Sequence, residues 1–437
     1  MDKIKLAGVV LFCGALALGG LASLLLPPRE YSVRENRVLT VRPDLDWEDV
    51  LDGSYQEDYE RYLSDQMPGR ERWVKLAVGL ERLTGHREIN GVYLGKEGYL
   101  LEEYHPSEFD KAQIEENIDL LAAFLDDMRE RYGENRVSCL LLPEKAAAIP
   151  NRLPEGVESG KEEEEQVMAG LRKRLKHTDS LLEAAAELQK YQGEYLYYRT
   201  DHHWTTLGAY YGYRFWAEQT GHKAGRLKDY ERETVFEDFF GTTYNKAPIQ
   251  VSGDRVELFH SPQEEGITIY SEEWEKPADS CYFPETAREG FNRYQVFFSG
   301  NAARIKITTK AETKRRLLVI KDSFANCFVP FLLGDYKEIW MIDFRYEKEN
   351  LYDILEEYEG VTDILVLYNM KNFMQEQNLH KLNQQAGTME KFDADSFFDE
   401  EEEEDDWEED DDSEITLDIT LYAYFFYRYL LSCYNHV

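Results

Sequence analysis

The feature that most constrains the fold is a series of short apolar runs separated by helical pattern. The clearest runs are VSCLLL (137–142), LLVI (317–320), EIWMIDF (338–344) and DILVLYN (363–369). Short apolar runs of this kind suit strands buried inside a sheet. Apolar residues at helical spacing lie between them, for example from Ile114 to Met128. The alternation predicts an α/β domain with a mainly parallel sheet.

The pattern changes between about residues 245 and 310. Four short β-like runs occur there, separated by polar turns: VELFH, ITIYS, YQVFFSG and IKITT. We expect a β-rich insertion in the α/β domain.

The N-terminal segment holds the longest apolar run, the 21 uncharged residues from Leu6 to Leu26. About 20 apolar residues span a bilayer, whereas the apolar part of a signal peptide has about 7–15. Residues 1–28 are therefore predicted to be a single-pass transmembrane helix, with the remaining chain on the extracytoplasmic side of the cell membrane. A cleaved signal peptide and a buried core helix are the alternatives.

Three further regions follow the predicted anchor. Residues 29–100 are expected to be a juxtamembrane helical region that ends in a hairpin, and residues 101–383 the main α/β domain. Residues 384–437 do not continue the α/β pattern. Their first part, Asp399 to Glu414, has 14 carboxylates in 16 positions, which is typical of a solvated, disordered tail.

Charge and cysteine content exclude several functions. With 50 Lys and Arg against 86 Asp and Glu, the net charge of −36 disfavours nucleic acid as a partner. The five cysteines form no CxxC pair, so zinc-finger and thioredoxin-like sites have no support.

Two polar segments follow predicted strands and carry residues suited to catalysis. Asp201, His202 and His203 precede a predicted helix, and Ser323 begins another helix directly after LLVI. Reacting groups of open α/β sheets gather beyond the carboxyl ends of strands. A serine nucleophile needs a base, usually histidine, and the histidine needs a carboxylate to hold its tautomer. Asp201, His203 and Ser323 supply these three roles.

Each element also has a structural interpretation. Ser323 could be only a helix cap, and Asp201 with its two histidines could be only a structural turn. Asp201, His202 and His203 could also bind a metal ion. Three adjacent residues rarely converge on one ion, so no metal and no cofactor are expected.

The segment YYRTDHHWTTLGAYYGY resembles the signature of the DHHW protein family. That family is similar to the alginate O-acetyltransferases AlgX and AlgJ, which carry an SGNH-hydrolase-like domain. Other matching segments are ENR (35–37), DQMPGR (65–70), GKEGYLLE (95–102), FFGTTYNKA (239–247), LLVIKDSFAN (317–326) and IDFRY (342–346).

The resemblance implies a three-layer, flavodoxin-like SGNH domain that is circularly permuted, because the Asp and His precede the Ser. It assigns the catalytic roles to Asp201, His203 and Ser323, and leaves His202 as the rival base. Asn369 corresponds to the asparagine of the third SGNH block and could bind the oxyanion, although a turn cap is the alternative. Arg345 could orient the substrate, or form an ion pair.

The expected function is an extracytoplasmic O-acetyltransferase that moves an acetyl group through an acyl-serine to a cell-surface or secreted polysaccharide. The resemblance also implies a membrane-bound O-acyltransferase as the partner that donates the acetyl group. A carbohydrate acetylesterase with the same three residues is the first alternative. A non-catalytic glycan-binding scaffold of a polymer-acetylation machine is the second.

Overall fold

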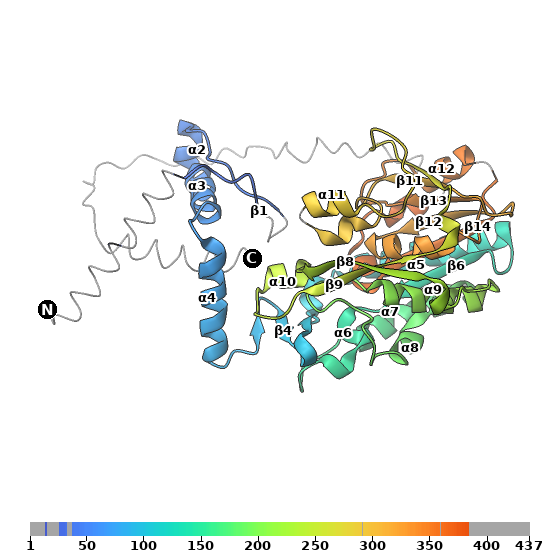
Figure 1. Cartoon of the computed structure of the whole chain (residues 1–437), viewed down its shortest axis with the longest axis horizontal. Coiled ribbons are helices and arrows are strands. Elements are labelled where there is room, and N and C mark those ends of the chain that lie inside the picture. Colours follow the sequence, from blue (N-terminus) through green and yellow to red (C-terminus); the bar gives the residue numbers. More distant parts are fainter. Residues whose placement is uncertain (1–13, 15–25, 33–36, 291, 359, 384–437) are drawn as a thin grey trace. The chain divides into compact units, whose positions relative to one another are not determined.

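The computed structural model describes residue 14 and residues 26–32, 37–290, 292–358 and 360–383. The chain divides into two compact units, one with Met1–His86 and Thr388–Val437, and one with Arg87–Gly387 (Figure 1). The predicted acidic tail, residues 384–437, lies outside the described residues.

The first unit combines a short hairpin with three helices: β1 (Tyr31–Ser32), β2 (Arg37–Val38), α2 (Trp47–Asp52), α3 (Ser54–Asp65) and α4 (Arg70–Leu83). Side chains at the end of α3 hold the hairpin segment. The Gln66 amide exchanges two hydrogen bonds of 2.8 Å with the backbone of Arg29, and the Asp65 carboxylate accepts the Thr40 N–H. Asp65 and Gln66 of the DQMPGR segment therefore have a structural role, because they fix the hairpin segment to α3.

The predicted single-pass membrane location needs correction. Within the part of the chain that the structure describes, no helix has both the length and the apolar character needed to cross a bilayer. Nearly all of the run from Leu6 to Leu26, where the anchor was predicted, lies outside the described residues.

The second unit is built around a seven-stranded sheet with the order β10-β11-β13-β12-β14-β6-β7. Its strands are β6 (Val137–Leu142), β7 (Leu181–Glu183), β10 (Thr268–Tyr270), β11 (Arg304–Thr308), β12 (Arg316–Lys321), β13 (Glu338–Ile342) and β14 (Asp363–Asn369). The five strands from β13 to β7 are parallel, and β11 and β10 continue the sheet antiparallel. The predicted α/β class and mainly parallel sheet are confirmed.

Smaller elements and helices complete this unit. A three-stranded sheet holds β3 (Glu88–Ile89), β4 (Val92–Leu94) and β5 (Leu100–Glu102), and a two-stranded sheet holds β8 (Glu231–Phe239) and β9 (Asp254–His260). The helices are α5 (Lys111–Tyr132), α6 (Lys145–Ala148), α7 (Lys161–Arg174), α8 (Ala184–Gln189), α9 (Thr206–Thr220), α10 (Thr242–Lys246), α11 (Pro284–Glu289), α12 (Leu351–Glu357) and α13 (Met370–Gln375).

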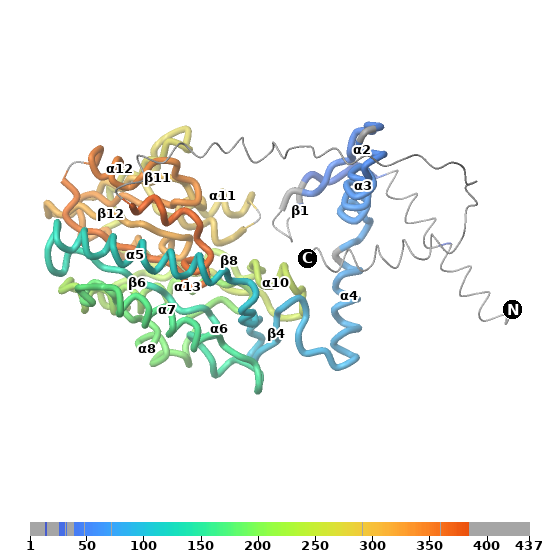
Figure 2. The backbone as a smooth tube through the Cα atoms, turned by 180° about the vertical axis from the view of Figure 1, so that it is seen from behind, coloured from blue at the N-terminus to red at the C-terminus, as the bar shows by residue number. Residues whose placement is uncertain are grey.

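Both faces of the main sheet are buried, which explains the uninterrupted apolar runs. On β12, Leu317 and Val319 join one core cluster while Leu318 and Ile320 join the other, because successive side chains point to opposite faces. The helices α8 and α9 contribute to the first cluster, and α5, α7, α12 and α13 to the second. Figure 2 shows α5 and α13 together on one side of the sheet. The unit therefore has three layers.

The predicted β-rich insertion is not a separate sheet. ITIYS and IKITT contain β10 and β11, which extend the main sheet, whereas VELFH lies in β9 and pairs with β8. YQVFFSG is mostly irregular and begins in the 3-10 turn η7 (Arg293–Val296). The helix predicted after LLVI is not one continuous α-helix. It consists of two 3-10 turns, η8 (Ser323–Cys327) and η9 (Val329–Leu332).

Candidate active site

The Asp201 segment is a tight turn closed by a short antiparallel bridge between Tyr197 and Trp204. The Tyr198 N–H donates to the His203 carbonyl at 3.1 Å. Directly after the turn, the Thr205 hydroxyl caps α9 by accepting the Gly208 N–H at 3.2 Å. The strand predicted before Asp201 is thus reduced to this bridge, and the side chains of the turn lie between its two arms.

The Ser323 segment lies where β12 ends and η8 begins, in the middle of the main sheet. Asp322 caps η8 by accepting the Phe324 N–H at 2.8 Å. Because Ser323 is the first residue of the turn, its own N–H has no acceptor within that turn. This places a hydroxyl and a backbone donor side by side at the carboxyl edge of the sheet.

Hydrogen bonds join the three predicted catalytic residues in a line. His203 Nδ1 is 2.6 Å from Asp201 Oδ1, and His203 Nε2 is 2.7 Å from Ser323 Oγ. A carboxylate only accepts, so Nδ1 carries the proton and Nε2 holds a lone pair toward the serine hydroxyl. All three side chains are buried. Such an arrangement can activate a serine for attack on an ester.

Asp201 has a second set of partners from α10. Its Oδ2 accepts the Thr242 N–H at 2.9 Å and the Thr242 hydroxyl at 3.1 Å. A Cβ on the neighbouring Gly241 would lie 2.2 Å from the Asp201 side chain, so only glycine fits there. Burial alone would raise the pKa of Asp201, but His203 and His202 hold that pKa well below its usual range. The carboxylate therefore stays ionised.

His202 is not in the line to Ser323. Its Nδ1 lies 2.6 Å from Thr242 Oγ1, and since the Thr242 proton goes to Asp201, His202 Nδ1 is the donor of that contact. Burial, followed by the charge of His203, lowers the pKa of His202 to about 3. His202 is thus neutral near pH 7, with its Nε2 free to accept a hydrogen bond. The structure puts His203, and not His202, in contact with Ser323.

Asn369 and Arg345 have different surroundings. Asn369 Oδ1 caps α13 by accepting the Lys371 N–H at 3.0 Å, while its Nδ2 is buried beside the Glu144 side chain. The Asn369 N–H donates to Asp322 Oδ2 at 2.7 Å, which brings this residue next to the serine turn. Arg345 instead forms a two-pronged pair with Asp343 at 2.9 and 2.7 Å, and Asp343 also binds the buried Lys321 at 3.1 Å.

Most of the atoms that could bind a metal ion are already engaged in hydrogen bonds. Candidate ligand atoms of Asp201, His202 and His203 lie within 4.8 Å of one another. Both Asp201 oxygens, both His203 ring nitrogens and His202 Nδ1 are engaged in the hydrogen bonds described above. Only His202 Nε2 has a free lone pair, so these groups fit a hydrogen-bonded relay better than a cation site.

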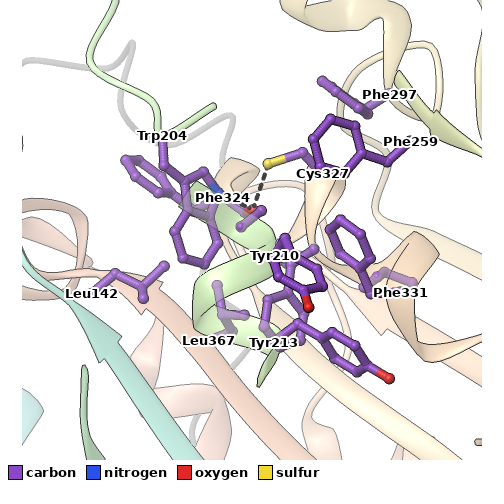
Figure 3. Packing of buried hydrophobic residues seen from close by; sticks show 14 of the residues in the cluster. Leu142, Trp204, Tyr210, Tyr213, Phe259, Phe297, Phe324, Cys327, Phe331 and Leu367 are labelled. Atoms are coloured by element: carbon purple, nitrogen blue, oxygen red, sulfur yellow. Dashed lines mark hydrogen bonds between the residues drawn. The ribbon is translucent and has the colours of Figure 1, made fainter. Parts of the chain in front are cut away.

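Two aromatic residues complete the site, and the sequence assigned neither a role. Tyr294 stacks on the His203 ring with centroids 3.8 Å apart, and its hydroxyl donates to the Ser323 carbonyl at 3.1 Å. Trp204 Nε1 donates to the Phe324 carbonyl at 3.0 Å, which ties the two turns together in the core (Figure 3). The contact of Trp204 with Phe324 could have been suspected from the sequence, because Trp204 belongs to the DHHW segment. Tyr294 lies in a run expected to be a strand.

Comparison with known proteins identifies the surrounding domain. Residues 184–342 match the model of the DHHW protein family. The resemblance to DHHW proteins is confirmed. Residues 92–261 also match a second model, the SGNH hydrolase-like domain of acetyltransferase AlgX. No curated protein sequence matches this chain.

Two solved structures have the same fold. A DHHW family protein from Eubacterium siraeum is 23% identical, with a TM-score of 0.54, over 68% of this chain and 95% of its own. Bacillus cereus PatB1, solved with a sulfonyl adduct, is 19% identical, with a TM-score of 0.52, over 64% of this chain and 94% of its own. The expected SGNH-hydrolase-like fold is therefore present, while its circular permutation stays a prediction.

Proposed function

We propose that this chain is an O-acetyltransferase that carries an acetyl group on Ser323 and passes it to a hydroxyl of a polysaccharide. The observation that carries the proposal is the hydrogen-bonded line from Asp201 through His203 to Ser323. The match to a domain described as acetyltransferase AlgX supports acetyl as the transferred group. The identity of the donor, including a membrane-bound acyltransferase, stays a prediction.

In the first step, His203 Nε2 takes the proton of Ser323 Oγ as that oxygen attacks the acetyl carbonyl of the donor. The tetrahedral oxyanion is held by the Ser323 N–H, with the buried Asn369 Nδ2 as the second candidate donor. When the intermediate collapses, the protonated His203 returns the proton to the leaving oxygen, and an acetyl-serine remains.

The second step reverses these roles. A sugar hydroxyl takes the place of the departed donor and gives its proton to His203 Nε2 as it attacks the acetyl-serine. Collapse releases the sugar ester and restores the Ser323 hydroxyl with the proton from His203. Water in place of the sugar would give hydrolysis, which is the esterase alternative. The two outcomes depend on how well the bound acceptor excludes water.

Intact-mass spectrometry of the full chain mixed with 4-nitrophenyl acetate tests the proposal. The wild type should gain one acetyl group, and Ser323→Ala should gain none at the same site. A matched control, Ser261→Ala, removes a serine that caps a turn elsewhere and should leave acetylation unchanged. Equal labelling of wild type and Ser323→Ala would overturn the proposal.

A further inference from the structure

Lys145 is a buried cation in contact with the turn that carries Asp201 and His203. It is the first residue of α6, and only 3% of its surface is exposed. Its Nζ donates to the Asp201 carbonyl at 2.8 Å and to the Tyr198 carbonyl at 3.4 Å. The ammonium group therefore links the start of the turn to its middle.

The hydrogen-bond partners of Lys145 Nζ are backbone carbonyls and not carboxylates. Burial lowers the pKa of Lys145 to about 8, and the charges of four carboxylates oppose this fall, in the order Glu102, Asp201, Asp254 and Glu144. The group is therefore still charged near pH 7. An apolar side chain of similar length would avoid the cost of burying this charge. The ammonium is better explained by the backbone that it holds.

The loop that carries Lys145 connects the turn to the main sheet. It follows β6, which lies next to β14, and β14 in turn lies next to β12, the strand that ends before Ser323. A second contact supports the connection, since the Tyr197 hydroxyl donates to the Pro143 carbonyl of the same loop at 2.8 Å. The loop after β6 therefore fixes the position of the turn relative to the strand that places the nucleophile.

Asp201 is held at both ends, and His203 depends on it. Lys145 binds the Asp201 carbonyl, while Thr242 binds Asp201 Oδ2. Asp201 Oδ1 accepts the backbone N–H of His203 at 2.9 Å and lies 2.6 Å from His203 Nδ1. Rotation of the Asp201 peptide would therefore move the His203 ring relative to Ser323. A displacement of about 1 Å can cost about 10²-fold in rate.

We propose that Lys145 is a positioning residue, which holds the turn so that His203 Nε2 stays directed at Ser323 Oγ. The purpose of this role rests on the proposed acetyl transfer, but the alignment itself can be measured without that reaction.

Proton NMR of the full chain tests the alignment. The proton on His203 Nδ1, which faces Asp201 Oδ1 at 2.6 Å, should give a low-field resonance that is assigned by its absence in His203→Ala. Lys145→Met keeps the length of the side chain and removes its N–H donors and its charge. The resonance should move or broaden in this variant.

Steady-state turnover of 4-nitrophenyl acetate gives the second measurement. Lys145→Met should lower kcat by about 10- to 100-fold and change KM by less than about twofold, because the base is misaligned while the contacts with the ester remain. Lys145→Gln keeps an N–H donor and should show a smaller loss of the same kind. It carries the test if Lys145→Met does not fold.

A matched control is available at Lys381. Its Nζ also donates to two backbone carbonyls, of Phe344 at 3.0 Å and of Glu347 at 2.6 Å, and neither belongs to the two turns of the site. Lys381→Met should leave the low-field resonance and kcat unchanged. An equal effect of Lys381→Met and Lys145→Met would mean that a general loss of stability is measured, and would overturn the proposal.

The outcomes separate the two proposals. An unchanged resonance in a folded Lys145 variant, or a kcat equal to that of the wild type, would overturn the role of Lys145. If the resonance moves as predicted but Ser323 of the wild type never gains an acetyl group, the positioning role stands and the acetyltransferase proposal fails. If the acetyl-serine forms and the Lys145 variants keep the wild-type resonance and kcat, only the positioning role fails.

Discussion

The two turns that meet at the candidate site are held in different ways. The Ser323 turn depends on its own sheet, because β12 lies between β13 and β14 and the Asp322 N–H donates to Leu367 of β14. Asp322 then accepts hydrogen bonds from Asn369 and Asn372, both at or beyond the end of the same neighbouring strand. Sheet geometry therefore places the nucleophile.

The turn around Asp201 has no strand of the main sheet to support it. Its position depends on buried polar groups from distant parts of the chain. Asp254, at the start of β9, accepts the N–H groups of Thr200 at 2.7 Å and Arg199 at 2.8 Å, and also the Thr200 hydroxyl. Thr242 holds the Asp201 side chain from α10, and Lys145 holds its carbonyl from α6. The base is therefore placed by tertiary contacts, and the nucleophile by secondary structure.

Removing the base should have the largest effect on turnover. This substitution tests whether His203 is the residue that activates Ser323. His203→Ala should lower the rate of 4-nitrophenyl acetate turnover by about 10³–10⁴, because the serine loses its proton acceptor. His202→Ala should lower it by less than about tenfold, since that ring does not contact Ser323. The measurement is the steady-state release of nitrophenolate without added sugar. A larger loss for His202→Ala would reassign the base.

Removing one hydrogen-bonding side chain from each turn should show how differently the two turns are stabilised. Asp254→Asn replaces an acceptor of several buried hydrogen bonds and should cost about 2–4 kcal/mol of unfolding free energy. Asn372→Ala removes one donor to Asp322 and should cost about 1 kcal/mol, because the Phe324 and Asn369 N–H groups still hold that carboxylate. Urea denaturation measures both. Equal costs would mean that the two turns are supported alike.

Acid should act on the two turns in opposite directions. Since the pKa of His202 falls to about 3 in the folded chain, the unfolded chain takes up this proton first, and stability is lost as the pH falls from about 6.5 toward 3. Burial raises the pKa of Asp322, so the folded chain takes up that proton first and acidification relieves a buried charge.

Substitutions can separate these two contributions. His202→Gln should reduce the loss of stability between pH 6.5 and 4 by an amount on the order of 2 kcal/mol, and Asp322→Asn should increase the loss. Melting temperatures measured across this pH range give the answer. If His202→Gln has the same acid sensitivity as the wild type, the histidine is not held neutral by its surroundings.

The smallest effect is expected where the two turns share a partner. Tyr294→Phe keeps the ring stacked on His203 and loses the contacts of the hydroxyl with the Ser323 carbonyl and with Cys327 Sγ, so turnover should fall about fivefold. Tyr294→Leu also removes the stacked ring and should cost more. The pH profile of turnover distinguishes loss of stacking, which moves the profile, from a general loss of stability. Identical rates for wild type and both variants would remove Tyr294 from the site.

Much of the fold was predictable because strands buried on both faces leave a continuous apolar run in the sequence. VSCLLL, LLVI and DILVLYN are such runs, and they became β6, β12 and β14. The runs between 245 and 310 were harder to assign. A short strand has the same pattern whether it joins the main sheet, as β10 does, or pairs in a separate ribbon, as β9 does.

The residue types that could do the chemistry were evident from the sequence, since Asp201, His203 and Ser323 carry the side chains that serine activation needs. It also placed Ser323 at a strand end, because strand and turn are set by local residues. The directions of the two histidines follow from the tertiary structure, in which His203 faces Ser323 and His202 turns to Thr242. Adjacent residues in a turn point in different directions, and the partners that select those directions, Thr242, Asp254 and Tyr294, are distant in sequence. Their positions depend on how the whole core packs.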